Sequence, residues 1–151
     1  MKRLSVFIAV LFFSGCASIT VPNYIQDDHP YKKKFYGSYD DILNATTQML
    51  MDFGWEISNS NDPNVYERVA VSNGKEDECV LLFTEIRQSS WFIGSRYNRV
   101  NIYIRSGASN TADVEIRYMT ITSIFFKQFK SFKNNAMAER MFTRIHDLLI
   151  Q

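Results

Sequence analysis

This chain has few of the residues from which catalytic and metal sites are built. It contains only two histidines, His29 and His146, and neither has a second histidine or a cysteine at the spacing of metal ligands. Its two cysteines form no Cys-x-x-Cys pair, and there is no Gly-x-Ser-x-Gly elbow and no phosphate-binding glycine loop. The acidic cluster Glu76–Glu78 follows a predicted turn, where its charge keeps a strand end soluble. We therefore expect no enzyme, no metal and no cofactor.

Other scarcities narrow the class of protein. The 151 residues suit one domain, and they include only six glycines and three prolines beside 12 phenylalanines and eight tyrosines, so most of the chain should be ordered. No apolar run reaches the about 20 residues of a membrane-spanning helix. The 17 basic and 16 acidic residues nearly balance, with a net charge of +1, which argues against a nucleic-acid partner.

The N-terminus has the layout of a secretory signal peptide. Lys2 and Arg3 precede an apolar run over residues 4–13, and two small residues stand directly before Cys16. The segment Phe13-Ser14-Gly15-Cys16 resembles the lipobox of bacterial lipoproteins, although the usual leucine is replaced by Phe13. This resemblance implies that residues 1–15 are a signal peptide, and that Cys16 carries a covalent lipid and becomes the mature N-terminus.

The same resemblance bears on location. In such lipoproteins an aspartate after the lipidated cysteine tends to retain the protein in the inner membrane, whereas this chain has Ala17. It therefore implies a lipid anchor, such as palmitate, on the periplasmic face of the outer membrane, with the inner membrane as the alternative. If Cys16 is lipidated, Cys79 is the only thiol left, and its apolar surroundings favour a buried, inert side chain.

Residues 16–35 show no sustained periodicity, and we interpret them as the lipidated cysteine and a flexible tether. Within them, the run Lys32–Lys34 either contacts anionic lipid head groups or is a solvated charge run at the edge of the domain. The globular domain is then expected over residues 36–151.

Two helices are predicted from local signals. Ser38 can cap the first, which ends before Gly54, and its apolar stripe includes Ile42 and Met49. Asn134 or Asn135 can cap the second, whose stripe runs from Ala138 to Leu149.

Strands are predicted between these helices from alternating apolar residues and turn signals. The segments are 55–57, 65–71, 78–88, 99–105 and 113–118, with turns at Asn73-Gly74 and at 107–110. We expect an α+β fold, in which a single antiparallel sheet of about four to five strands is flanked by the N-terminal and C-terminal helices, packed on one face. This element order resembles that of the small α+β domains of BamC-type assembly lipoproteins.

Two segments are candidates for interaction. Trp91, Phe92 and Ile93 place three large apolar side chains where a hairpin tip is expected, and exposed apolar patches mark interfaces. The alternative is that they cover an end of the core or continue a strand.

The second candidate segment interleaves phenylalanines with lysines: Phe125, Phe126, Lys127, Phe129 and Lys130. It is either an amphipathic stretch in a membrane interface, with lysines reaching the head groups, or a loop or helical turn held to the core by its phenylalanines.

These observations favour a membrane-anchored, periplasm-facing lipoprotein that is a non-enzymatic accessory or assembly component and binds another envelope protein. One alternative is a module that binds lipid or a small amphiphile between the helices and the sheet. Another is an envelope enzyme whose site is assembled from residues distant in sequence.

Overall fold

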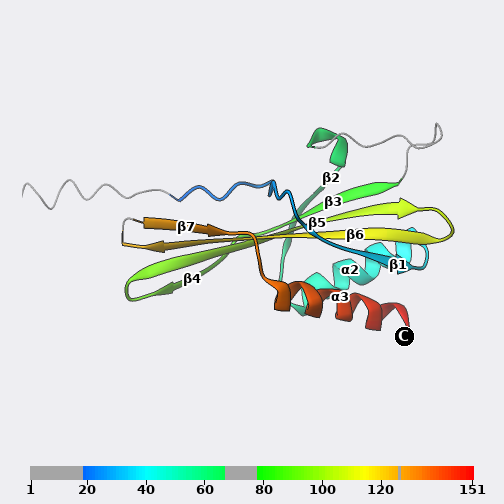
Figure 1. Cartoon of the computed structure of the whole chain (residues 1–151). Coiled ribbons are helices and arrows are strands. Elements are labelled where there is room, and N and C mark those ends of the chain that lie inside the picture. Colours follow the sequence, from blue (N-terminus) through cyan, green and yellow to red (C-terminus); the bar gives the residue numbers. More distant parts are fainter. Residues whose placement is uncertain (1–18, 67–77, 126) are drawn as a thin grey trace, which may run out of the picture.

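The structure is a computed structural model that describes residues 19–66, 78–125 and 127–151. Within these residues, seven strands form a single antiparallel sheet and two α-helices lie on one face of it (Figure 1). The α+β class with one antiparallel sheet is confirmed. The expectation of about four to five strands is wrong, because strands also form in segments that we had assigned to the tether and to loops.

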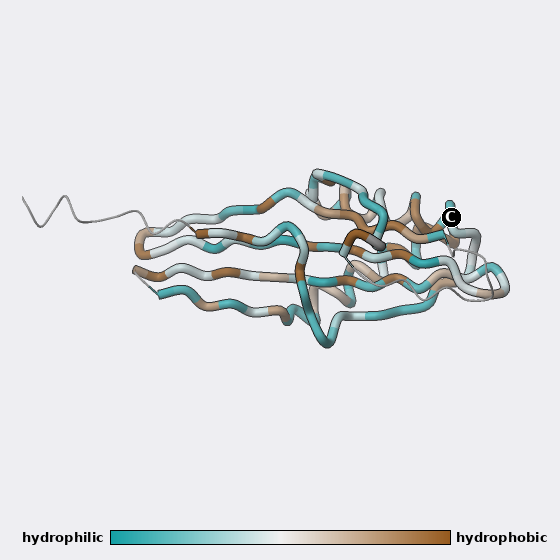
Figure 2. The backbone as a smooth tube through the Cα atoms, turned by 90° about the horizontal axis from the view of Figure 1, so that it is seen from above, coloured by the Kyte–Doolittle hydropathy of each residue, from teal (hydrophilic) through white to brown (hydrophobic). Residues whose placement is uncertain are grey.

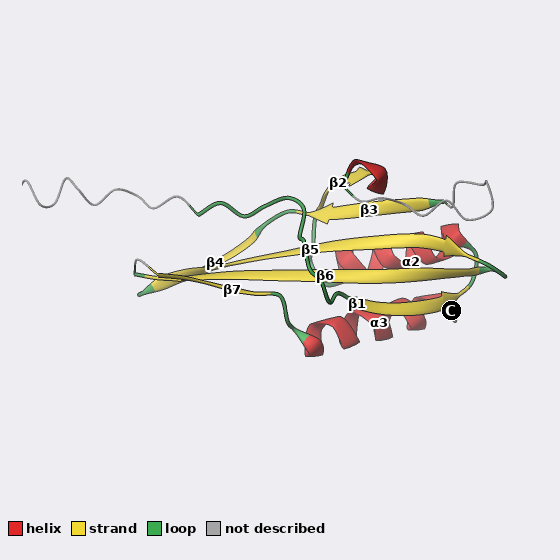
Figure 3. Cartoon of the chain, turned by 45° about the horizontal axis from the view of Figure 1, so that its top comes forward, coloured by secondary structure: helices red, strands yellow, loops and turns green. Residues whose placement is uncertain are grey.

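The sheet is built around two long neighbouring strands. Its strands are β1 (Tyr31–Tyr36), β2 (Ile57–Asn61), β3 (Cys79–Thr84), β4 (Arg87–Trp91), β5 (Gly94–Gly107), β6 (Thr111–Ile124) and β7 (Lys127–Ser131). The order β1-β6-β5-β3-β2 makes up one half, and β5 and β6, each of 14 residues, continue beyond it. There β4 pairs with β5 and β7 pairs with β6, so the far half has the order β4-β5-β6-β7 (Figure 3).

Both helices begin directly after the capping residues that the sequence indicated. In α2 (Tyr39–Asp52), the Ser38 hydroxyl accepts a hydrogen bond from the Asp41 amide at 3.1 Å, and Gly54 follows the helix with φ +72°. In α3 (Asn135–Leu149), the Asn134 side chain accepts from the Met137 amide at 3.1 Å. These contacts satisfy amide groups that a helix start leaves without an intrahelical partner.

The core lies between the two helices and the first half of the sheet. It contains Ile42, Met49, Leu50, Met141, Phe142 and Ile145 from the helices and Leu82, Val100, Ile102, Ile104, Val114 and Ile116 from the strands. Phe53 packs against this cluster, while Phe142 and Ile145 are buried within it. These side chains occupy the space in which we had considered an amphiphile, so we place no ligand there.

An ion pair joins the exposed sides of the two helices. Nη2 of Arg144 on α3 lies 2.6 Å from Oδ2 of Asp52 on α2. A hydrogen bond from Gln48 and then the contact with Arg144 hold the pKa of Asp52 below its ordinary value, so this carboxylate stays charged at neutral pH.

Residues 19–30 lie across the opposite face of the sheet, and we call them the strap. Ile25 is fully buried against Met119 and Ile121, and its amide donates to Oδ1 of Asn101 at 2.7 Å. The structure thus differs from the expected flexible tether over residues 19–35, which includes the strap and most of β1. The physical reason is that the sheet's second face is apolar in its middle, and the strap removes that surface from water.

A buried charged cluster lies beside the strap on this face. Nε of Arg117 donates to Oε1 of Glu115 at 2.6 Å, and the same guanidinium donates to the Tyr24 hydroxyl at 2.6 Å. Nζ of Lys32 lies 2.9 Å from Oε2 of Glu115 at the surface. Burial of a charge is tolerated only with such partners, so this cluster ties the strap to β6 and β1.

The strand predicted over residues 65–71 lies at the edge of the described residues and runs beyond it. Val65 ends a short 3₁₀ helix, η1 (Pro63–Val65), instead of starting a strand. The rest of the predicted strand over 67–71, the Asn73-Gly74 turn and the carboxylates Glu76 and Asp77 all fall in the range 67–77, which the structure does not describe.

Candidate functional site

The far half of the sheet extends beyond the helices as a four-stranded ribbon. We call residues 87–98 and 120–131 the distal ribbon; they comprise β4, the start of β5, the end of β6, and β7. Figure 1 shows α2 and α3 under the other half only. Every residue of β4 and β7 is exposed, so these strands are held mainly by backbone pairing with β5 and β6.

The β4–β5 hairpin ends in a tight turn made of large apolar residues. Trp91 pairs with Gly94, which leaves Phe92 and Ile93 as the two residues of the turn. Phe92 is fully exposed, while Trp91 and Ile93 are 40% and 43% exposed. This segment therefore does not cover an end of the core, although Trp91 does continue strand β4.

The β6–β7 turn lies directly beside it. Phe125 takes the left-handed conformation with φ +52°, and its amide donates to the Ile93 carbonyl at 3.3 Å. Its side chain is 75% exposed. We call Trp91, Phe92, Ile93 and Phe125 the distal tip. In Figure 2 the tube is brown, that is hydrophobic, at the β4–β5 turn and at the end of β6. Phe126 lies outside the described residues.

A close backbone approach fixes this geometry at Gly94. A Cβ atom there would lie 2.1 Å from the backbone oxygen of Ser123 on β6, far inside van der Waals contact. Only glycine therefore fits at this position without moving the strands apart. The apposition of the two turns is built into the pairing of Gly94 with Ile124.

The other predicted residues of β7 are exposed around the tip. Residues two apart in a strand share a face, so the register places Lys127 and Phe129 on the same face as Trp91 and Arg96. Phe129 is 56% exposed and does not hold the segment to the core. The Arg96 guanidinium lies 5.9 Å from the centre of the Trp91 ring, and Lys130 lies on the other face.

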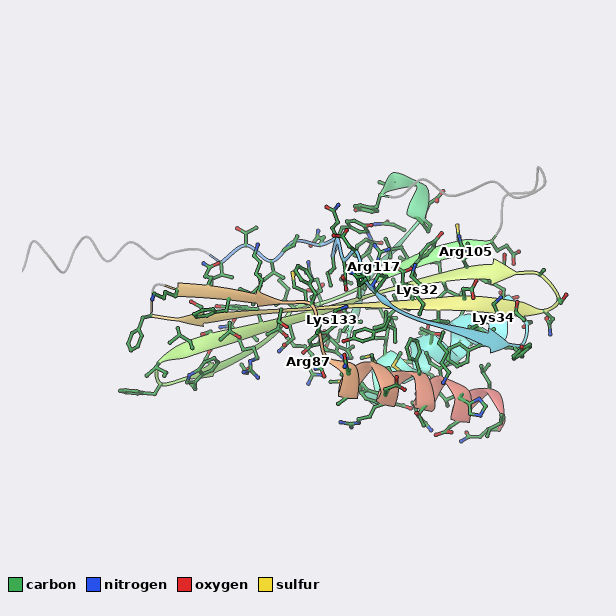
Figure 4. All side chains as sticks on the ribbon, viewed as in Figure 1. Lys32, Lys34, Arg87, Arg105, Arg117 and Lys133 are labelled. Atoms are coloured by element: carbon green, nitrogen blue, oxygen red, sulfur yellow. The ribbon has the colours of Figure 1, made fainter. Side chains whose placement is uncertain are left out.

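The distal ribbon carries charge of one sign. It contains Arg87, Arg96, Lys127 and Lys130, and none of the chain's 16 acidic residues lies within it. Arg87 is engaged at the base of the ribbon, where it donates to the Phe53 carbonyl at 2.9 Å (Figure 4). The remaining three cations surround the tip. Sequence reasoning singled out the residues of the tip but missed the absence of acidic residues from residues 87–98 and 120–131, which can be read directly in the sequence.

The opposite end of the sheet has a different chemistry. A groove of about 250 Å³ lies there on the face without helices, and Lys32, Lys34, Arg105, Asp113 and Glu115 line it. Figure 4 shows Lys32, Lys34 and Arg105 at this end of the sheet. Nζ of Lys34 lies 4.0 Å from Oδ1 of Asp113, and both side chains are well exposed. The groove therefore offers both signs of charge to a partner.

The residues considered for catalysis do not come together. His146 is exposed on α3, and His29 lies in the strap, where its carbonyl accepts from Lys133 at 2.6 Å. Glu78 is exposed and Cys79 is half-buried. Among the described residues, no group of three or more His, Cys, Asp or Glu side chains could hold a metal ion.

No protein-family model and no curated protein matches the chain. Within the part of the chain that the structure describes, no helix is both long and apolar enough to cross a membrane.

Proposed function

We propose that the chain is a lipid-anchored accessory protein of the cell envelope that binds another envelope protein and has no catalytic role. The lipid is covalently attached to Cys16, which becomes the mature N-terminus when residues 1–15 are removed, and the protein lies on the periplasmic face of the outer membrane. It uses no further cofactor and binds no nucleic acid.

The observation that carries this proposal is the difference between the two ends of the sheet. One end is the apolar, acid-free distal tip, and the other is a groove with both signs of charge. Exposed apolar patches and complementary charges are features of docking surfaces. The strap supports an orientation in which the distal ribbon lies nearer the lipid anchor, since the strap runs from the sheet toward the distal ribbon as it approaches Cys16 (Figure 1).

The partner protein is expected at the charged groove. Polar, charged interfaces suit accessory contacts that form and dissociate, whereas permanent ones are more apolar. Arg105 and Asp113 present opposite charges on neighbouring strands, so they suit a protein segment that carries both.

The anchor is tested by replacing Cys16 with serine. Wild-type protein is expected to incorporate labelled palmitate. It is also expected in the membrane fraction, because acyl chains make membrane attachment durable. Cys16→Ser should lose the label and accumulate as unprocessed precursor. Cys79→Ser is the matched control and should keep both label and location. Retention of the label by Cys16→Ser would show that the anchor is assigned wrongly.

The partner is tested by cross-linking in living cells from a photoreactive residue at Arg105. We expect one discrete adduct with an envelope protein, identified by mass spectrometry. The control is the same residue at Asn44 on the exposed side of α2, which should give no such adduct. If Arg105 captures only the background seen from Asn44, the groove is not the binding site for a protein.

A further inference from the structure

We infer that the distal tip inserts into the interfacial region of the bilayer that holds the lipid on Cys16, so that the protein touches its membrane at two points. This inference rests on the proposed lipid anchor and adds a direct contact between the folded protein and the bilayer.

The first argument is where the chain leaves the fold. The strap contacts Asn101 through Ile25, then Arg99 through Pro22, and its first described residue, Ile19, packs in the cluster of Met119 and Ile121. This order runs along β5 and β6 toward the distal tip (Figure 1). The strap is therefore aimed at the same end of the molecule as the two exposed turns.

The second argument is length. Cys16 precedes Ile19 by three residues, which span at most about 11 Å. Ile121 lies four residues before Phe125, which is about 13 Å along a strand. The lipidated residue is thus confined to the neighbourhood of the distal ribbon, and the bilayer surface must lie within reach of the tip.

The third argument is the composition of the tip. Trp91, Phe92, Ile93 and Phe125 are exposed at one end of a narrow ribbon, where they can enter the bilayer without burying any of the helix-covered half. Aromatic side chains, tryptophan above all, are favoured at the boundary between head groups and acyl chains. A second membrane contact explains why these side chains are outside the core.

The fourth argument is charge. Arg96 and Lys127 lie on one face of the ribbon and Lys130 on the other, with no acidic residue in either hairpin. Long basic side chains beside an inserted apolar group can reach anionic head groups. A protein partner could also bind aromatic residues, but it would have to occupy the space that the short link to Cys16 assigns to the membrane.

The test uses the full lipidated protein in vesicles of phosphatidylethanolamine and phosphatidylglycerol, with and without brominated acyl chains. The chain has two tryptophans: Trp91 at the tip and Trp55, which is 3% exposed in the core. We expect brominated lipid to quench about half of the fluorescence from Trp91, since bromine quenches only on contact and interfacial residues touch the upper acyl chains. The Trp91→Phe variant, which reports Trp55 alone, should show almost no quenching.

A second variant removes the apolar contact and leaves the fluorophore. Phe92→Ser combined with Phe125→Ser changes two exposed side chains, so the fold should be retained, and quenching of Trp91 should fall severalfold. Quenching equal to that of the wild type would overturn the inference. So would an absence of quenching in wild-type protein that is palmitoylated and vesicle-bound, and so would a discrete protein adduct from a photoreactive residue at Phe92 in cells.

The anchor and the tip can fail separately. If Cys16 is lipidated but Trp91 is not quenched, the anchor stands and the inference is wrong. If Cys16 is not lipidated, the unmodified chain is mixed with the same vesicles: Trp91 quenching there would support insertion of the tip, and its absence would overturn it.

Discussion

Replacing Arg117 with leucine is expected to lower the free energy of unfolding by about 3 kcal/mol. Removal of one partner from a buried ion pair costs about 3–5 kcal/mol, because the remaining charge stays buried without compensation. Here the Glu115 side chain is 11% exposed, and it would lose its contact with Arg117. The lower end of the range applies because Lys32 still reaches Glu115 from the surface at 2.9 Å.

Urea denaturation of the single and double variants measures this effect. Glu115→Gln in the Arg117→Leu background removes the stranded charge, so the double variant should be more stable than Arg117→Leu alone. Lys34→Leu is the control on the same face: its pair with Asp113 is exposed, and its loss should cost no more than about 1 kcal/mol. A loss for Arg117→Leu no larger than that for Lys34→Leu would show that the buried pair contributes little.

The helices could be predicted because their signals are local. Ser38 and Asn134 cap the backbone within one turn, and the apolar stripes repeat at the helical period whatever they pack against. The central parts of β5 and β6 were predicted for a similar reason, since one of their faces is buried and the sequence alternates there.

The strands that we missed have no such pattern. β4 and β7 are exposed on both faces, so their sequences need not alternate between apolar and polar residues. They form because β5 and β6 are long enough to offer them backbone hydrogen bonds beyond the core. β1 carries the run Lys32–Lys34, which is typical of solvated segments; as an edge strand it keeps those lysines at the surface and buries only Phe35.

The residues of the candidate site were predicted from the sequence, but their arrangement in a single tip was not. Phe92 and Phe125 belong to segments about thirty positions apart, and their apposition depends on a register between β5 and β6 that pairs Gly94 with Ile124. Such register is set by the turn at the other end of the hairpin and by the core pattern. The two aromatic segments could therefore be recognised in the sequence, whereas the single tip that they form could not.

Replacing Ile25 with alanine is expected to lower the free energy of unfolding by about 2–4 kcal/mol. Ile25 is fully buried and packs on Met119 and Ile121. Truncation of its side chain therefore leaves a cavity and removes apolar contacts. A residue in a flexible tether would tolerate the same change without loss. The prediction therefore distinguishes the packed strap from the tether that the sequence suggested.

Two measurements separate global from local destabilisation. Urea denaturation reports the loss for the whole domain, and limited proteolysis reports cleavage within residues 19–30. Thr20→Ala, at an exposed position of the same segment, is the matched control and should change neither. The strap can open locally without unfolding of the sheet. In that case Ile25→Ala will strongly raise the rate of cleavage within residues 19–30 and lower the urea midpoint only slightly, because the substitution destabilises the strap alone. Unchanged cleavage and stability would contradict the packing of the strap against the sheet through Ile25.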